Sequence, residues 1–142
     1  MSQVDFYVLQ ADGDGARHQF ACRLAEKAYR LNNTVHIKVR DADTMRQLDD
    51  LLWTFRDGSF VPHEISGAAT AETASPVTVG HDDWPTTNPD LLINLGEAVP
   101  ENMSSFPRVA EVVTSDEGSK AQSRERFAQY RDQGHTLNTH KL

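Results

Sequence analysis

The fold is decided by residues 4–40, VDFYVLQADGDGARHQFACRLAEKAYRLNNTVHIKVR. The stretch begins with β-branched and aromatic residues at 4–9, which favour a strand, and apolar and polar side chains alternate over 34–40 as in a second strand. Between them, apolar residues recur three and four positions apart, which predicts a helix over 16–31. Those residues are Phe20, Leu24, Ala28 and Leu31. A strand, a helix and a second strand joined in this way predict parallel pairing.

The rest of the chain continues this alternation. A second helix is predicted over 41–55, with Asp41 or Asp43 at its start, and a last helix over 116–133. Further strands are expected over 76–80, 91–95 and 108–113. A surface loop is expected over 64–76, and a short tail over 135–142. We therefore expect one α/β domain over 1–142, with a mostly parallel sheet and helices on both faces.

Composition limits the possible function classes. The chain has 142 residues, which suits one domain, and a formal net charge of -7. Its single cysteine, Cys22, allows no internal disulfide and favours a reducing compartment. No apolar stretch approaches the ~20 residues that span a bilayer, and the first residues do not resemble a signal peptide. These properties predict a cytoplasmic protein with no membrane contact.

The charge is unevenly distributed. Residues 118–142 hold five Lys and Arg against two Asp and Glu, a net of +3, which leaves -10 for residues 1–117. A basic end on an acidic body predicts a local site for an anion. The acidic body disfavours strong direct binding to nucleic acid, because phosphates repel it.

The turn after the first strand lacks catalytic or nucleotide-binding chemistry. Residues 12–15 (DGDG) lie where a phosphate loop would occur in an α/β fold, but no lysine follows, and two aspartates would repel phosphates. An ordinary tight turn is expected there. No histidine or cysteine spacing indicates a metal site, no nucleophile motif is present, and no cofactor is expected. A small nucleotide-binding or hydrolytic enzyme remains the alternative, on fold class alone.

The basic end contains a patterned stripe. On a helix, Lys120, Arg124, Phe127 and Arg131 fall at i, i+4, i+7 and i+11, which puts them on one face. A solvated helix face would explain the cations. A groove for an acidic peptide that ends in an aromatic residue would also explain the ring, because arginine holds a carboxylate through two hydrogen bonds and Phe127 would be exposed beside it.

A second segment, residues 52–63, is rich in aromatic side chains at a helix end. Such residues are often part of a core, but tryptophan and phenylalanine beside Pro62 are also typical of an interface. The sequence leaves both readings open.

Four segments together resemble the chi subunit of bacterial DNA polymerase III. They are FYVL at 6–9, LDDLLWTF-x3-SFVPHEISG at 48–67, LLINL at 91–95 and RERFAQYR-x2-G-x-x-LNT at 124–139. The resemblance implies a single α/β domain, similar to nucleotide-binding proteins but without their site, and no catalysis of its own. It implies two partners. One is the psi subunit, which links chi to the clamp-loader complex, and the other is the acidic C-terminal tail of single-stranded DNA-binding protein, which ends in proline and phenylalanine.

The resemblance also assigns residues to the tail site. Lys120, Arg124 and Thr139 match positions that contact the tail in this family. Phe127 stands where the enteric version has tyrosine, so the ring is kept and a hydroxyl is lost. Ala128 stands where that version has lysine, so one cation is absent.

Two further expectations follow from the resemblance. Lys141 is a candidate to compensate for the absent cation. The aromatic block that matches the psi-binding positions consists of Trp53, Phe60, Val61 and Pro62.

Overall fold

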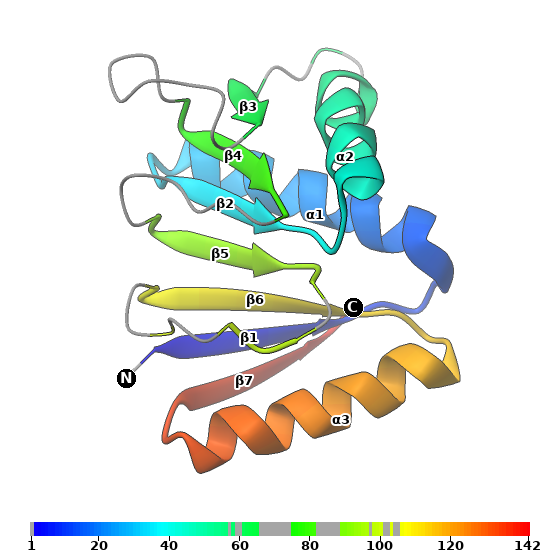
Figure 1. The fold of residues 1–142 in the computed structure, drawn as a ribbon, viewed down its shortest axis with the longest axis vertical. Helices are drawn as coiled ribbons and strands as arrows, with labels where there is room; N and C mark the ends of the chain where they lie inside the picture. Colours follow the sequence, from blue (N-terminus) through cyan, green and yellow to red (C-terminus); the bar gives the residue numbers. More distant parts are fainter. Residues whose placement is uncertain are drawn as a thin grey trace.

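Parallel strands form a layer with helices on either side of it (Figure 1). The structure is a computed structural model that describes residues 2–56, 58, 61–65, 75–81, 89–96, 98–100, 103 and 106–142. The elements along the chain are β1 (Gln3–Val8), α1 (Gly13–Arg30), β2 (Val35–Lys38), α2 (Ala42–Thr54), β3 (His63–Ile65), β4 (Val77–Gly80), β5 (Leu91–Asn94), β6 (Arg108–Val113), α3 (Glu117–Asp132) and β7 (Thr136–Lys141).

The sheet is parallel throughout the part of the chain that the structure describes. Seven strands pair in the order β3-β4-β2-β5-β6-β1-β7, and every pair runs parallel. β1 lies between β6 and β7, so the two ends of the chain pair directly with each other. This confirms the predicted α/β fold, and α1, α2 and α3 each carry the chain between parallel strands.

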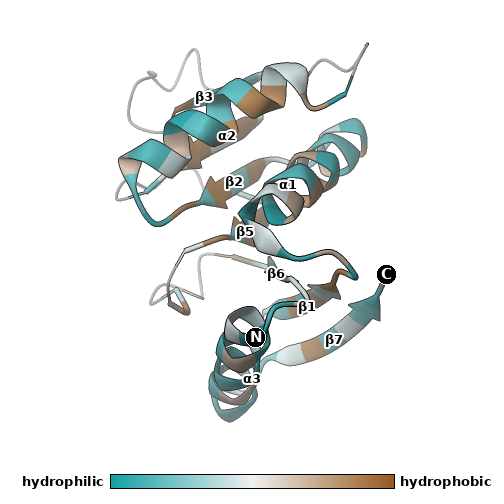
Figure 2. Cartoon of the chain, turned by 90° about the vertical axis from the view of Figure 1, so that its right-hand side faces the viewer, coloured by the Kyte–Doolittle hydropathy of each residue, from teal (hydrophilic) through white to brown (hydrophobic). Residues whose placement is uncertain are grey.

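Each face of the sheet has its own core. α1 and α2 pack on one face through buried residues such as Cys22, Leu48 and Leu52. α3 packs on the other face, where Tyr130 joins a cluster that includes Phe6. Figure 2 shows α1 and α3 on opposite sides of the strands. Burial raises the pKa of the Cys22 thiol to about 12, so the thiol stays protonated in this core.

Alternation along β1 decides which residues face which helix. Val4 and Phe6 belong to the core under α3, whereas the ring of Tyr7 lies 5.2 Å from that of Phe20 on α1. Strand side chains alternate with a period of two, so consecutive residues of β1 pack into the cores on opposite faces of the sheet.

The helix ends follow local chemistry. Asp41 caps α2 as predicted, because its side chain accepts a hydrogen bond from the Thr44 N–H at 2.7 Å. Helix α1 ends at Arg30, just before Asn32, which adopts a left-handed φ of 64° that asparagine tolerates better than most residues. The prediction of a turn over 12–15 is wrong, because α1 already begins at Gly13.

The predicted tail is also a strand. β7 pairs with β1 over its full length, from Gln3↔Thr136 to Val8↔Lys141. On the α1 side of the sheet, the ring of His140 stacks on Tyr7 at 4.9 Å, and its Nε2 lies 3.0 Å from Asp5 Oδ1. Backbone pairing and these contacts fix residues 136–141 in place.

The expected loop over 64–76 is partly correct. Its first residues belong to β3, which pairs with β4 at the edge of the sheet, and residues 66–74 lie outside the described part of the chain. No helix among the described residues is long and apolar enough to cross a membrane.

Candidate functional site: a basic surface on α3 and β7

Helix α3 arranges the stripe as the spacing predicts. It runs from Glu117 to Asp132 without interruption, so residues 120, 124, 127 and 131 lie along one face. Asp116 caps the start of α3 through the Ser119 N–H at 3.2 Å, and Gly134, with a φ of 87°, follows its end. The helix therefore holds the stripe on a rigid element.

The cations of the stripe differ in their surroundings. Lys120 Nζ lies 3.9 Å from Glu117 Oε1, and Arg131 Nε lies 3.6 Å from Asp132 Oδ1. The cations at both ends of the stripe therefore each have an acid beside them. Arg124 is exposed, and within the described ranges no ion pair involves it. Arg124 is therefore the cation of the stripe best placed to bind the carboxylate of a partner.

Phe127 lies between the stripe and the core. Its ring is half-buried and packs against Phe6 at 5.4 Å with an interplanar angle of 52°. The ring is therefore less exposed than the sequence predicted. One side supports the cluster under α3, and the remaining surface borders Arg124 along the helix face.

Strand β7 adds the last members of the surface. Thr139 is exposed and pairs in register with Phe6, the same residue that contacts Phe127. Lys141 pairs with Val8, so both side chains point to the α3 side of the sheet, as Phe6 and Val8 do. We call Lys120, Arg124, Phe127, Thr139 and Lys141 the α3–β7 surface. Arg131 lies on the same face of α3, closer to the end of the helix.

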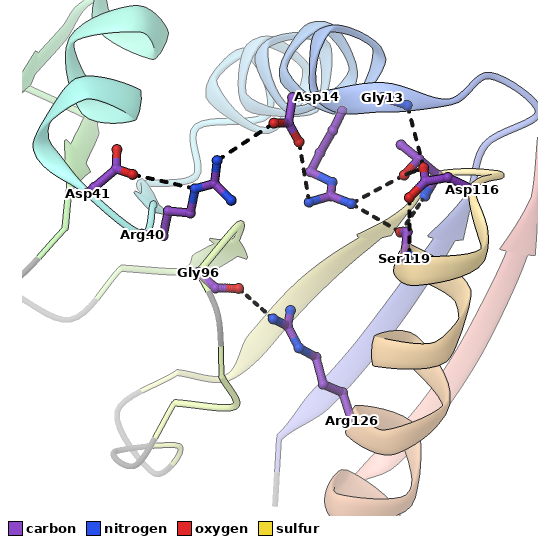
Figure 3. Close-up of polar contacts among 10 residues, drawn as sticks. Gly13, Asp14, Arg40, Asp41, Gly96, Asp116, Ser119 and Arg126 are labelled. Atoms are coloured by element: carbon purple, nitrogen blue, oxygen red, sulfur yellow. Dashed lines mark hydrogen bonds and ion pairs between the residues drawn. The ribbon is translucent and has the colours of Figure 1, made fainter.

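Arg126 has a different role from the other cations at this end of the chain. Its Nη1 donates to Glu111 Oε1 at 2.7 Å and its Nη2 to the Gly96 carbonyl at 2.5 Å. Figure 3 shows the side chain reaching from α3 to Gly96. The side chains of Arg126 and Glu111 are 12% and 3% exposed. Arg126 is thus neutralised internally, and the basic surface has one cation fewer than the sequence count suggests.

Glu111 is the centre of a buried polar network that sequence reasoning missed. Its Oε2 accepts from the Tyr130 hydroxyl at 2.6 Å and from Asn94 Nδ2 at 2.7 Å. Burial, and then the Glu111 charge, raise the pKa of Tyr130 far above its usual range, so the phenol stays a donor. With Arg126, these bonds tie α3 to β5 and β6. The signal in the sequence was an acid in the middle of an otherwise apolar strand.

The second predicted site is only partly at the surface. Trp53 is 54% exposed, with its ring 4.5 Å from that of His63. Pro62 is half-buried, whereas Val61 is 0% exposed within the core under α1 and α2. The assignment of Val61 to a binding surface is therefore corrected, because no side-chain surface remains for a partner. Phe60 lies outside the described residues.

A third region lies at the carboxyl ends of the strands, where nucleotides bind in folds of this class. A cavity of about 520 Å³ opens there. Its charged lining includes Asp14, Asp41 and Asp43 against Arg17 and Arg40. The arginines face these acids, since Arg40 lies 3.8 Å from Asp14 and 3.4 Å from Asp41, and Arg17 lies 3.8 Å from Asp14 (Figure 3). The excess of carboxylates disfavours phosphate binding.

A carboxylate of the chain itself also faces the start of α1. Asp116 Oδ1 accepts from the Gly13 N–H at 3.5 Å, next to its bond with the Thr114 hydroxyl at 2.5 Å (Figure 3). These hydrogen bonds, with the Thr114 bond the largest cause, lower the pKa of Asp116 to about 2. The helix N-terminus that would hold a phosphate therefore already has an anion beside it.

The low pKa of Asp116 predicts a pH effect on stability. Its folded pKa lies below the usual 3.8, so its contribution is present above that value and is lost as the pH falls through about 2. In Asp116→Asn, which keeps a capping side chain but does not titrate, the free energy of unfolding should fall less between pH 4 and 2 than in the native protein. Urea unfolding measures both slopes. Glu117→Gln removes a neighbouring exposed carboxylate and is the control, and equal slopes for native protein and Asp116→Asn would contradict the assignment.

Comparison with known proteins identifies the family. A family model described as "DNA polymerase III chi subunit, HolC" matches residues 1–138. DNA polymerase III subunit chi of Pseudomonas aeruginosa is 39% identical over 100% of this chain and 98% of the relative. The protein of the same name from Escherichia coli is 31% identical over 98% of this chain and 97% of the relative.

A solved structure shares the fold alone. S. cerevisiae Dbp5 bound to RNA and ADP BeF3 matches with a TM-score of 0.61 at 12% identity, over 96% of this chain and 41% of that chain. The likeness agrees with the parallel sheet and with the prediction of a nucleotide-binding-like architecture. Together with the full-length relatives, the family match settles the membership: the chain belongs to the DNA polymerase III chi subunit family.

Proposed function

We propose that the chain is a non-catalytic adaptor of DNA polymerase III in the cytoplasm, and that its α3–β7 surface binds the acidic C-terminal tail of single-stranded DNA-binding protein. The observation that carries this is Arg124, an exposed guanidinium with no acid partner among the described residues, beside the half-buried ring of Phe127. A guanidinium suits a terminal carboxylate, and the edge of an apolar ring suits a terminal phenylalanine.

The electrostatics favour a peptide over a nucleic acid. Lys120 on α3 and Lys141 on β7 add positive charge to the surface that holds Arg124, but the chain as a whole carries -7. An acidic tail needs only this local surface, whereas a long phosphate backbone would also meet the acidic body. Lys141 supplies charge on the α3 side of the sheet, which would offset the lysine that Ala128 replaces in comparison with the enteric family pattern.

We place the second contact of the adaptor near β3, the edge strand opposite β7 in the sheet. Trp53 is one of the exposed large hydrophobic side chains of the described residues, and it lies over His63 near the β3 edge. Exposed tryptophan is typical of interface hot spots. With the half-buried Pro62, it forms the surface that we assign to the psi subunit and, through psi, to the clamp-loader complex.

Two rival functions receive less support. For a nucleotide-binding or hydrolytic enzyme, the carboxylates of Asp14, Asp41, Asp43 and Asp116 at the strand ends are unfavourable to phosphates. For a direct nucleic-acid binder, one cation of the basic end, Arg126, is already paired internally with Glu111.

A titration with a tail peptide tests the proposal. An acidic peptide that ends in proline and phenylalanine should bind the full chain in calorimetry, and its affinity should fall as ionic strength rises from about 0.05 M to about 0.5 M, because partly exposed ion pairs are screened. Removal of the terminal phenylalanine should abolish measurable binding, since it takes away both the ring and the correctly placed carboxylate. Lack of saturation by the intact peptide even at low salt would contradict the proposal.

A further inference from the structure

Strand β7 leaves one edge of the sheet open. It is the last strand in the order, and in the part of the chain that the structure describes β1 is its only partner. β7 is six residues long, whereas β3 at the opposite edge has three. Figure 1 shows it as the outermost strand beside α3. Edge strands are often blunted by proline or by bulges, and β7 has neither, since its register with β1 is continuous.

The hydrogen bonds to β1 identify which backbone groups face outward. The Thr136 N–H donates to the Ser2 carbonyl at 3.1 Å, and the Leu142 N–H donates to the Val8 carbonyl at 3.0 Å. Parallel strands use every second residue for one neighbour, so Asn138 and His140 also face β1. Residues 137, 139 and 141 therefore present both N–H and C=O groups to the open edge.

The same residues carry the side chains of the basic surface. Val4↔Leu137, Phe6↔Thr139 and Val8↔Lys141 are register pairs, and the β1 residues of these pairs pack under α3. Thr139 and Lys141 thus offer outward backbone groups at the edge and side chains toward α3. A peptide along this edge would place every second side chain beside Arg124 and Lys141.

From this coincidence we infer that the acidic tail binds as an added strand on β7, extending the sheet by main-chain hydrogen bonds. The inference rests on the proposed function and specifies how that site holds its ligand. Strand addition supplies affinity through the backbone, and side chains on alternate positions supply selectivity. The charges favour this occupant over a second copy of the chain, because two β7 edges together would bring Lys141 and its equivalent into one interface.

N-methylation of the tail peptide tests the binding mode directly. One N-methyl group at a time, placed along the peptide, removes one donor and adds bulk at the strand edge. Strand addition predicts a period of two: alternate positions should lose about tenfold or more in affinity, and the positions between them should change little. Calorimetry with the full chain measures each peptide.

A matched pair of variants tests the same edge from the protein side. Thr139→Pro removes an outward N–H that β1 does not use, and proline is tolerated at such edge positions. Thr139→Val keeps that N–H, so Thr139→Pro should bind the unmodified tail peptide about three- to tenfold more weakly than Thr139→Val. Hydrogen exchange on the native protein gives a readout without mutation, because the amides of Leu137, Thr139 and Lys141 should gain protection when the peptide binds.

The outcomes separate this inference from the proposed function. Tight binding of the unmodified peptide, with no period of two and no new protection at 137, 139 and 141, would overturn strand addition and leave the tail site standing. Absence of binding by the unmodified peptide would overturn both.

Discussion

Arg126→Ala is expected to lower the free energy of unfolding by about 3 kcal/mol, because it leaves the buried Glu111 carboxylate without its cation. The two side chains are 12% and 3% exposed and meet at 2.7 Å. The Asn94 amide and the Tyr130 hydroxyl would still donate to Glu111, which places the loss near the lower end of the range for a broken buried pair. Urea unfolding followed by circular dichroism measures the change.

Arg131→Ala is the matched control for this prediction. It removes the same side chain from the same helix, but Arg131 is 65% exposed and its neighbour Asp132 is exposed as well, so the change should stay within about 0.5 kcal/mol. A double variant, Arg126→Met with Glu111→Gln, should recover part of the lost stability, because no unpaired charge is left inside and the glutamine oxygen can still accept from the Tyr130 hydroxyl. If Arg126→Ala and Arg131→Ala had equal effects, the network would not stabilise the packing of α3.

The pattern of apolar residues was sufficient for those elements whose side chains are buried. β5 is a mostly apolar run that is buried along its length, β2 alternates apolar with polar residues, and α1 and α2 each bury one stripe. β7 was missed because only Leu137 among its six residues is apolar and half-buried, while the others are exposed. Backbone pairing with β1 makes it a strand, and side-chain periodicity does not record such pairing.

The sequence predicted which residues of the candidate site share one face of α3, but not how deeply each of them is buried. The helical period correctly placed Lys120, Arg124 and Phe127 on one face of α3. How far Phe127 is covered depends on Phe6, more than a hundred residues earlier, and spacing within α3 contains no information on that contact. Likewise, the count of cations could not separate Arg126, which faces Glu111 on β6, from Arg124, which faces solvent.

Arg124→Ala should weaken binding of the acidic tail by roughly ten- to a hundredfold, with no loss of stability. The guanidinium is exposed and makes no ion pair within the described part of the chain, so its removal leaves no internal group unsatisfied. A hydrogen bond between charged groups contributes about 1.5–3 kcal/mol, which sets the expected range. The affinity of Arg124→Lys for the tail should lie between those of the native protein and Arg124→Ala, because lysine keeps the charge and loses the bidentate geometry.

Arg46→Ala provides the control for net charge in the same calorimetric titration. Arg46 lies on α2, is 63% exposed and pairs with Asp43, so its removal makes the same change in charge away from the α3–β7 surface. Its affinity for the tail peptide should stay within about twofold of the native value, since charges further apart than the Debye length of about 8 Å are largely screened at physiological salt. Equal losses for Arg46→Ala and Arg124→Ala would mean that the whole field of the protein, and not a carboxylate held by Arg124, attracts the peptide. Unchanged affinity for Arg124→Ala would remove the α3–β7 surface as the tail site.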